Sequence, residues 1–177
     1  MNTNESDKAS LLIGGDTLWS TQHKTDLLIT PYRWSGDDEE SLPLKTGKVP
    51  TTYNAAPGYR IFRKVEHSPG YLSYGPYLKT ITGGELQRLF ITCAVDNLGN
   101  PNDLIAEYDL VDHANGGSDI VTPVQVKVSD LHGIRVFGIY LDRPIGLSPG
   151  MDIECRIFAH GGADLYFLHM YWDIFWT

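Results

Sequence analysis

The chain has 177 residues, which is enough for one domain with a full core and short for two domains. Its formal net charge of −8 repels phosphate backbones and anionic lipid, which argues against binding to nucleic acid or to a membrane surface. With 18 Gly, 10 Pro, 10 Tyr, 6 Phe and 4 Trp, the composition is typical of short β-strands joined by tight turns.

The first 57 residues have an irregular pattern. The apolar patch Leu11 to Ile13 lacks the length and basic flank of a secretion signal, and no apolar run reaches the roughly 18 residues of a membrane-spanning helix. The localisation is therefore left open. Leu27 to Thr30 form a candidate strand that Pro31 ends, and an acidic loop follows it. We expect residues 1–57 to form a tail and an arm with long loops, and residues 58–177 to form the folded domain.

From Gly58 onward, apolar and polar residues alternate with a period of two, which indicates β-strands. Leu89, Ile91, Cys93 and Val95 share one face of their strand in this pattern. Gly, Pro and Asn turns separate the candidate strands, and no segment has a helical period over three turns. The candidate strands cover residues 59–65, 71–81, 89–95, 104–110, 124–128, 134–141, 151–157 and 163–172. This pattern predicts an all-β protein, an antiparallel β-sandwich or jelly roll.

The chain has two cysteines, Cys93 and Cys155. Both lie at positions that point to the apolar face of their strands, as small core residues do. A disulfide between them requires that the two strands be neighbours, which the sequence leaves open.

Three short motifs follow one another in the part of the chain after Gly58: Tyr74-Gly75-Pro76-Tyr77, Ser148-Pro149-Gly150 and His160-Gly161-Gly162-Ala163-Asp164-Leu165. In this order they resemble the galactose-binding-like jelly-roll modules found beside bacterial glycosyltransferases and surface-glycan enzymes. The resemblance covers about residues 58–172. It implies a carbohydrate-binding module with a jelly-roll fold, and a role in glycan recognition without a fixed set of binding residues.

No catalytic constellation is evident. His160-Gly161-Gly162 has no Gly-x-Ser-x-Gly elbow to accompany it, and the many carboxylates single out no pair across a cleft. We therefore expect that the protein is not an enzyme. Residues 96–103 are rich in oxygen donors but do not match an EF-hand loop. We expect no cofactor, although the resemblance implies that a structural calcium ion is an option.

Glycan recognition requires aromatic faces that stack on sugar C–H groups and a few polar side chains that bind hydroxyls. The candidate residues are the aromatic side chains Trp34, Tyr74, Tyr77 and Trp172 and the loop residues Asp96, Asn97 and Asn100. In a regular strand Tyr74 and Tyr77 face opposite sides, unless the kink at Gly75-Pro76 resets the alternation. We expect that one of the two tyrosines belongs to the core.

The C-terminal segment, Tyr171 to Trp176, is unusually apolar for a chain end. It either closes the core or forms an interface with another chain, which would make the protein a homo-oligomer. The leading hypothesis is a non-catalytic, lectin-like β-sandwich that binds carbohydrate. The alternative is a structural or assembly jelly roll, such as a capsid, fibre or secretion-associated protein, that works through subunit contacts. A sugar-modifying enzyme is the third option.

Overall fold

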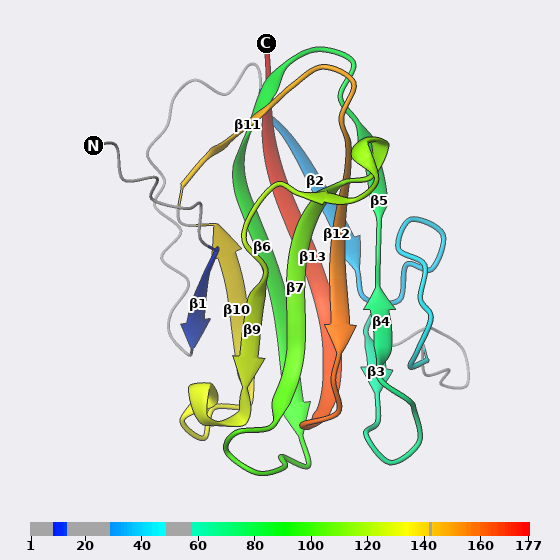
Figure 1. The fold of residues 1–177 in the computed structure, drawn as a ribbon, viewed down its shortest axis with the longest axis vertical. Helices are drawn as coiled ribbons and strands as arrows, with labels where there is room; N and C mark the ends of the chain where they lie inside the picture. The colour runs from blue at the N-terminus through cyan, green and yellow to red at the C-terminus, as the bar shows by residue number, and fades with distance from the viewer. Residues whose placement is uncertain (1–8, 14–28, 49–57, 142) are drawn as a thin grey trace.

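The protein is an antiparallel β-sandwich in the computed structural model, which describes residues 9–13, 29–48, 58–141 and 143–177. The larger sheet has the strand order β1-β10-β6-β13-β2, with β11 also paired to β6 and β3 to β13. The smaller sheet has the order β4-β12-β7-β8, with β5 also paired to β12 and β9 to β7. Figure 1 shows β7 and β12 in front of β6 and β13.

The chain passes repeatedly from one sheet to the other, as in a jelly roll, and this confirms the predicted fold class. The strands of the larger sheet are β1 (Ala9–Ile13), β2 (Ile29–Ser35), β3 (Arg60–Phe62), β6 (Gly84–Asp96), β10 (Val136–Leu141), β11 (Ile145–Leu147) and β13 (Asp164–Trp176). Those of the smaller sheet are β4 (Gly70–Ser73), β5 (Pro76–Lys79), β7 (Leu104–Asp112), β8 (Ser118–Asp119), β9 (Val124–Lys127) and β12 (Asp152–Ala159). The described helical segments are two single 3₁₀ turns, η1 (His113–Asn115) and η2 (Val128–Leu131), so no described helix is long enough to cross a bilayer.

The core lies between the two sheets and is built from the alternating positions that the sequence pattern predicts. Leu89, Ile91, Cys93 and Val95 on β6 are all buried. They belong to one cluster with the inward-facing side chains of β7 and β12, namely Ala106, Tyr108, Leu110, Ile153, Cys155 and Ile157. Glu154 and Arg156, which lie between the inward-facing positions of β12, point to the other face of the smaller sheet.

Cys93 and Cys155 are free thiols inside this core, on β6 and β12 respectively. The hydroxyl of Tyr108 donates a hydrogen bond to Sγ of Cys93 at 3.3 Å. Burial raises the pKa of the Cys93 thiol to about 12, and it raises that of Cys155 well above its usual value. Both residues therefore act as small, protonated core side chains, as their positions in the strands predict.

Part of the segment expected to be an arm is a strand of the sandwich. β2 pairs with β13 over its full length, from Ser35 opposite His169 to Ile29 opposite Phe175. Pro31 does not end this strand as predicted. β2 lies at the edge of the sheet as described, and an edge strand tolerates a proline within it. Leu42 is fully buried in the core, so residues 29–48 pack with the domain expected to begin at residue 58. The remaining arm positions, apart from β1, lie outside the described residues.

The aromatic C-terminal segment belongs to β13, which lies between β6 and β2 in the larger sheet. Trp172 and Ile174 are fully buried, and Trp176 is partly buried against the core. Of the two predicted roles for this segment, closing the core is therefore the one that these side chains show.

A buried arginine ties the loop after β2 to the sandwich. Arg60 is fully buried, and its guanidinium donates hydrogen bonds to the carbonyl oxygens of Leu72 at 2.9 Å and Leu42 at 2.8 Å. A third, longer contact of 3.5 Å reaches the carbonyl oxygen of Asp38. Burial lowers the pKa of Arg60, while the nearby acids Glu39, Asp38 and Asp37 act in the opposite direction. Arg60 thus supplies donors to backbone carbonyls that would otherwise be buried without partners.

Replacing Arg60 with alanine should lower the free energy of unfolding by roughly 2–4 kcal/mol, because buried carbonyls lose their donors. Urea unfolding of R60A and the wild-type protein measures the difference. R135A is the matched control, since Arg135 is exposed and pairs with the exposed Asp96; its cost should stay below about 1 kcal/mol. Equal stability of R60A and the wild type would contradict this account of Arg60.

Candidate functional site

A cavity with a volume of about 500 Å³ lies on the outer face of the smaller sheet. Strands β4, β5 and β12, the segment around Lys45 and the turn at η1 all contribute to it. We call it the tyrosine cavity; it is lined by Lys45, Tyr71, Tyr74, Tyr77, His113, Gly116, Gly117, Glu154 and Arg156. Figure 1 shows η1 beside β5, and the ring of His113 on η1 packs against Tyr77 on β5.

Tyr74 and Tyr77 both line this cavity, so the expectation that one of them belongs to the core is wrong. The chain between β4 and β5 changes direction at Gly75, whose φ is +107°, and Tyr77 itself has a φ of +57°. The pairing of β5 with β12 shifts register between Ile153 and Glu154. These changes reset the alternation of side chains and bring the two tyrosines to the same face. The kink at Gly75-Pro76 is where the sequence left such a reset open.

Glycine is required at position 75 by its conformation and its surroundings. A Cβ atom there would lie 2.7 Å from the carbonyl oxygen of Ser41, and the positive φ disfavours other residues. The carbonyl oxygen of Gly75 accepts a hydrogen bond from the Cys155 amide at 2.9 Å, which holds the kink against β12. The kink is thus fixed by backbone contacts on two sides.

The aromatic side chains form a row along the cavity. Ring centroids are separated by 6.3 Å for Tyr71 and Tyr74, 6.5 Å for Tyr74 and Tyr77, and 5.0 Å for Tyr77 and His113. Neighbouring planes meet at angles of 64°, 80° and 74°, so each contact is edge to face. The rings therefore brace one another and form a bent wall rather than a flat surface.

Arg156 is held in the cavity by Asp109 on the neighbouring strand β7. Nε and Nη2 donate to the two carboxylate oxygens of Asp109 at 2.7 and 2.6 Å, a bidentate pair that also raises the pKa of Arg156. The remaining nitrogen, Nη1, lies beside Gly117. A Cβ atom added to that glycine would be 3.6 Å from Nη1. Arg156 therefore has a fixed orientation and a donor outside the pair with Asp109.

Glu154 occupies the opposite part of the lining and is only 5% exposed. One of its oxygens lies 3.4 Å from Nδ1 of His113, and its carboxylate also accepts a hydrogen bond from the Tyr77 hydroxyl. Burial, followed by the negative charge of Glu154, raises the pKa of Tyr77 to about 12. The Tyr77 hydroxyl is therefore protonated at neutral pH and can donate to the Glu154 carboxylate.

The two predicted tryptophans do not join the cavity. Trp172 is fully buried in the core, so the prediction that it contacts a ligand is wrong. Trp34 on β2 packs edge-on against Trp172 at 5.2 Å and stacks with Tyr32 at 5.7 Å. Trp34 thus belongs to the packing of the larger sheet, while the cavity lies on the smaller one.

Asp96 ends β6, and Asn97 and Asn100 lie in the turn that leads to β7, at the opposite end of β7 from η1 (Figure 1). Their polar atoms serve the turn. The Asp96 carboxylate accepts from the Asn97 amide at 2.9 Å, Asn97 Nδ2 donates to Asp164 at 2.6 Å, and the Asn100 amide donates to Asp103 at 2.7 Å. The described residues contain no group of three or more His, Cys, Asp or Glu side chains that could hold a metal ion. A structural calcium ion remains an untested prediction.

Sequence reasoning missed five polar or aromatic residues of the tyrosine cavity: Lys45, Tyr71, His113, Glu154 and Arg156. For Glu154 and Arg156 a signal existed, because both occupy the outward positions of the most regular alternating strand. For Lys45 and His113 no local pattern indicates a site, since pairing between distant segments brings them there.

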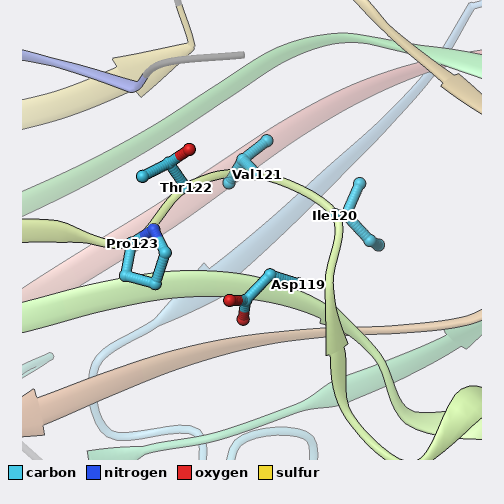
Figure 2. Close-up of a pocket in the computed structure, with 5 residues that line it drawn as sticks. All are labelled: Asp119, Ile120, Val121, Thr122 and Pro123. Carbon is cyan, nitrogen blue, oxygen red and sulfur yellow. The ribbon is translucent and has the colours of Figure 1, made fainter. Parts of the chain in front are cut away.

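Two further cavities have less to offer a ligand. One, of about 270 Å³, is lined by five consecutive residues, Asp119 to Pro123; Figure 2 shows them from the end of β8 along the loop that follows. The other, of about 20 Å³, lies within the core and is lined mainly by apolar side chains of both sheets. Neither brings charged side chains from several elements together, as the tyrosine cavity does.

No protein-family model and no curated protein matches this sequence. The assignment of a function therefore depends on the geometry of the tyrosine cavity.

The raised pKa of Tyr77 predicts a loss of stability at alkaline pH. Its ordinary value is 10.0 and its value in the folded protein is about 12, so the stabilisation is complete below pH 10 and is lost as the pH rises towards 12. Urea unfolding between these two pH values should show a shallower decline for Y77F than for the wild type. Identical slopes would contradict the contact between Tyr77 and Glu154.

Proposed function

We propose that the protein is a non-catalytic carbohydrate-binding β-sandwich module, and that its glycan binds in the tyrosine cavity. The observation that carries the proposal is the convergence of three tyrosines with Lys45, His113, Glu154 and Arg156 in one open cavity. The cavity volume of about 500 Å³ lies within the range of small-ligand sites.

The chemistry of this lining suits a sugar. The bent row of tyrosine rings offers apolar faces for C–H groups, while fixed polar atoms can bind hydroxyls. Within the described chain, no hydrogen bond uses the hydroxyls of Tyr71 and Tyr74, so both are available to a ligand. Arg156 adds an oriented donor, because Asp109 holds its guanidinium in place.

A binding role fits the cavity better than hydrolysis of a glycosidic bond. Most glycosidases use two carboxyl groups that flank the scissile bond. Glu154 is the single carboxylate among the described residues of the cavity lining, and it contacts both His113 and Tyr77. This arrangement supports recognition, and a sugar-modifying enzyme remains the third hypothesis.

The resemblance to galactose-binding-like modules supports the same proposal, since both tyrosines of its Tyr74-Gly75-Pro76-Tyr77 motif line the cavity. The assembly hypothesis comes second. An exposed aromatic C-terminus would favour it, but the Trp172 and Ile174 side chains of that segment pack inside the sandwich. A homo-oligomer is compatible with either proposal.

The proposal predicts that Y74A loses glycan binding while the fold persists. Tyr74 is partly exposed, and removal of its ring should weaken affinity by roughly tenfold or more, as for an aromatic residue at the centre of a binding site. An array of neutral and acidic glycans, followed by calorimetry on the best ligand, measures this loss. Thermal melts of both proteins check the fold.

Y140A is the matched control, because Tyr140 is a partly exposed tyrosine on β10 of the larger sheet, outside the cavity. Its affinity should equal that of the wild type. If the wild-type protein binds no glycan on the array, with or without added calcium, the proposed function is wrong.

A further inference from the structure

The charged groups of the tyrosine cavity differ in how far other side chains neutralise them. The cavity has two cations, Lys45 and Arg156, and one carboxylate, Glu154. Which of these charges still lacks a counter-charge indicates the kind of ligand that the cavity would favour.

Glu154 has partners in the protein. Nδ1 of His113 lies 3.4 Å from its carboxylate, and the Tyr77 hydroxyl donates to it. Since the side chain is also 5% exposed, a ligand has little access to its remaining oxygen lone pairs. Glu154 therefore organises one end of the cavity rather than attracting a cation from solution.

Arg156 is paired only in part. Asp109 neutralises its charge through Nε and Nη2, and Nη1 lies outside that pair, beside Gly117. The bidentate contact removes the freedom of the guanidinium before a ligand arrives. Nη1 is thus a preorganised donor in the cavity lining.

Lys45 is the other cation of the cavity, and none of the described carboxylates forms an ion pair with it. Its Nζ lies 5.5 Å from the ring centroid of Tyr71 and 5.4 Å from that of Tyr74. Two cation–π contacts hold the ammonium over the aromatic row, and the amide of Lys45 donates to the Tyr71 carbonyl at 2.8 Å. The backbone of Lys45 is therefore fixed to β4, and its side chain lies over the tyrosine rings of the cavity.

We propose that the glycan is acidic: the carboxylate of a uronic-acid-type sugar pairs with Lys45, and Nη1 of Arg156 donates to the same ligand. This inference rests on the proposed function. An anionic group would supply the counter-charge that Lys45 lacks and would form a charge-assisted hydrogen bond. The sugar ring would remain in contact with Tyr74.

A cationic ligand is disfavoured by the same geometry. Aromatic rings beside a carboxylate can hold an ammonium group. Here Lys45 already occupies the position over Tyr71 and Tyr74, so a ligand cation would have to displace it and would meet its repulsion.

The test compares hexuronate oligosaccharides with the same oligosaccharides after reduction of their carboxyl groups, by calorimetry with the full chain. The wild type should bind the acidic form about tenfold more tightly, and this preference should shrink as NaCl rises from about 50 to about 500 mM. K45Q should lose the preference and keep its affinity for the reduced form. K48Q is the control, because Lys48 is exposed and pairs with Glu66 at 3.2 Å outside the cavity.

The outcomes separate the two proposals. Equal binding of acidic and reduced oligosaccharides, or a preference for acid that K45Q leaves unchanged, overturns the acidic-ligand inference and leaves carbohydrate binding intact. Absence of binding to both forms and to every neutral glycan overturns the two proposals together. Thermal melts of K45Q and K48Q within a few degrees of the wild type exclude a change of fold as the cause.

Discussion

The alternation of side chains along β12 is the constraint on which both the core and the cavity depend. Ile153, Cys155 and Ile157 point inward and close the sandwich, so Glu154 and Arg156 necessarily point outward. The ladder with β7 then sets Asp109 opposite Arg156, and this register orients the guanidinium. A shift of one residue would exchange the two sets and would remove core and cavity at once. The chemistry of the outer face is therefore held in place by the burial of the inner face.

The break between β4 and β5 interrupts the regular alternation beside the cavity, and it enlarges the aromatic surface. A regular strand would present either Tyr74 or Tyr77 to the outer face. The turn at Gly75, fixed by the close carbonyl of Ser41 and the hydrogen bond from Cys155, presents both. Ser41 belongs to the loop after β2, and the buried Arg60 binds the carbonyl of Leu42 in the same loop. The shape of the cavity wall is thus coupled to a segment far away in the sequence.

Local patterns predicted the sandwich and the buried positions of β6, β7 and β12. They named both tyrosines of the kink as candidates but wrongly assigned one of them to the core. They failed where the outcome depends on pairing between distant segments. Pro31 indicated the end of a strand because sequence alone does not tell an edge strand from a central one. Trp172 is an aromatic residue of the kind that contacts sugars, and this suggested a ligand contact. The strands that flank it in the sheet, β6 and β2, are remote in the sequence, so its burial was not evident. No local pattern marked Lys45 or His113 as site residues, because distant segments of the chain bring them to the cavity.

The net charge of −8 and the local charges of the cavity affect different steps of binding. Net charge sets the long-range field, which falls off over a Debye length of about 8 Å at physiological salt and tends to slow the approach of an anion. Inside the cavity, the fixed neighbours determine which charge is favoured, and there Glu154 and Arg156 already have partners whereas Lys45 has none among the described carboxylates. An acidic surface is therefore compatible with an anionic sugar, provided that contacts made after encounter, and not electrostatic steering, supply the affinity.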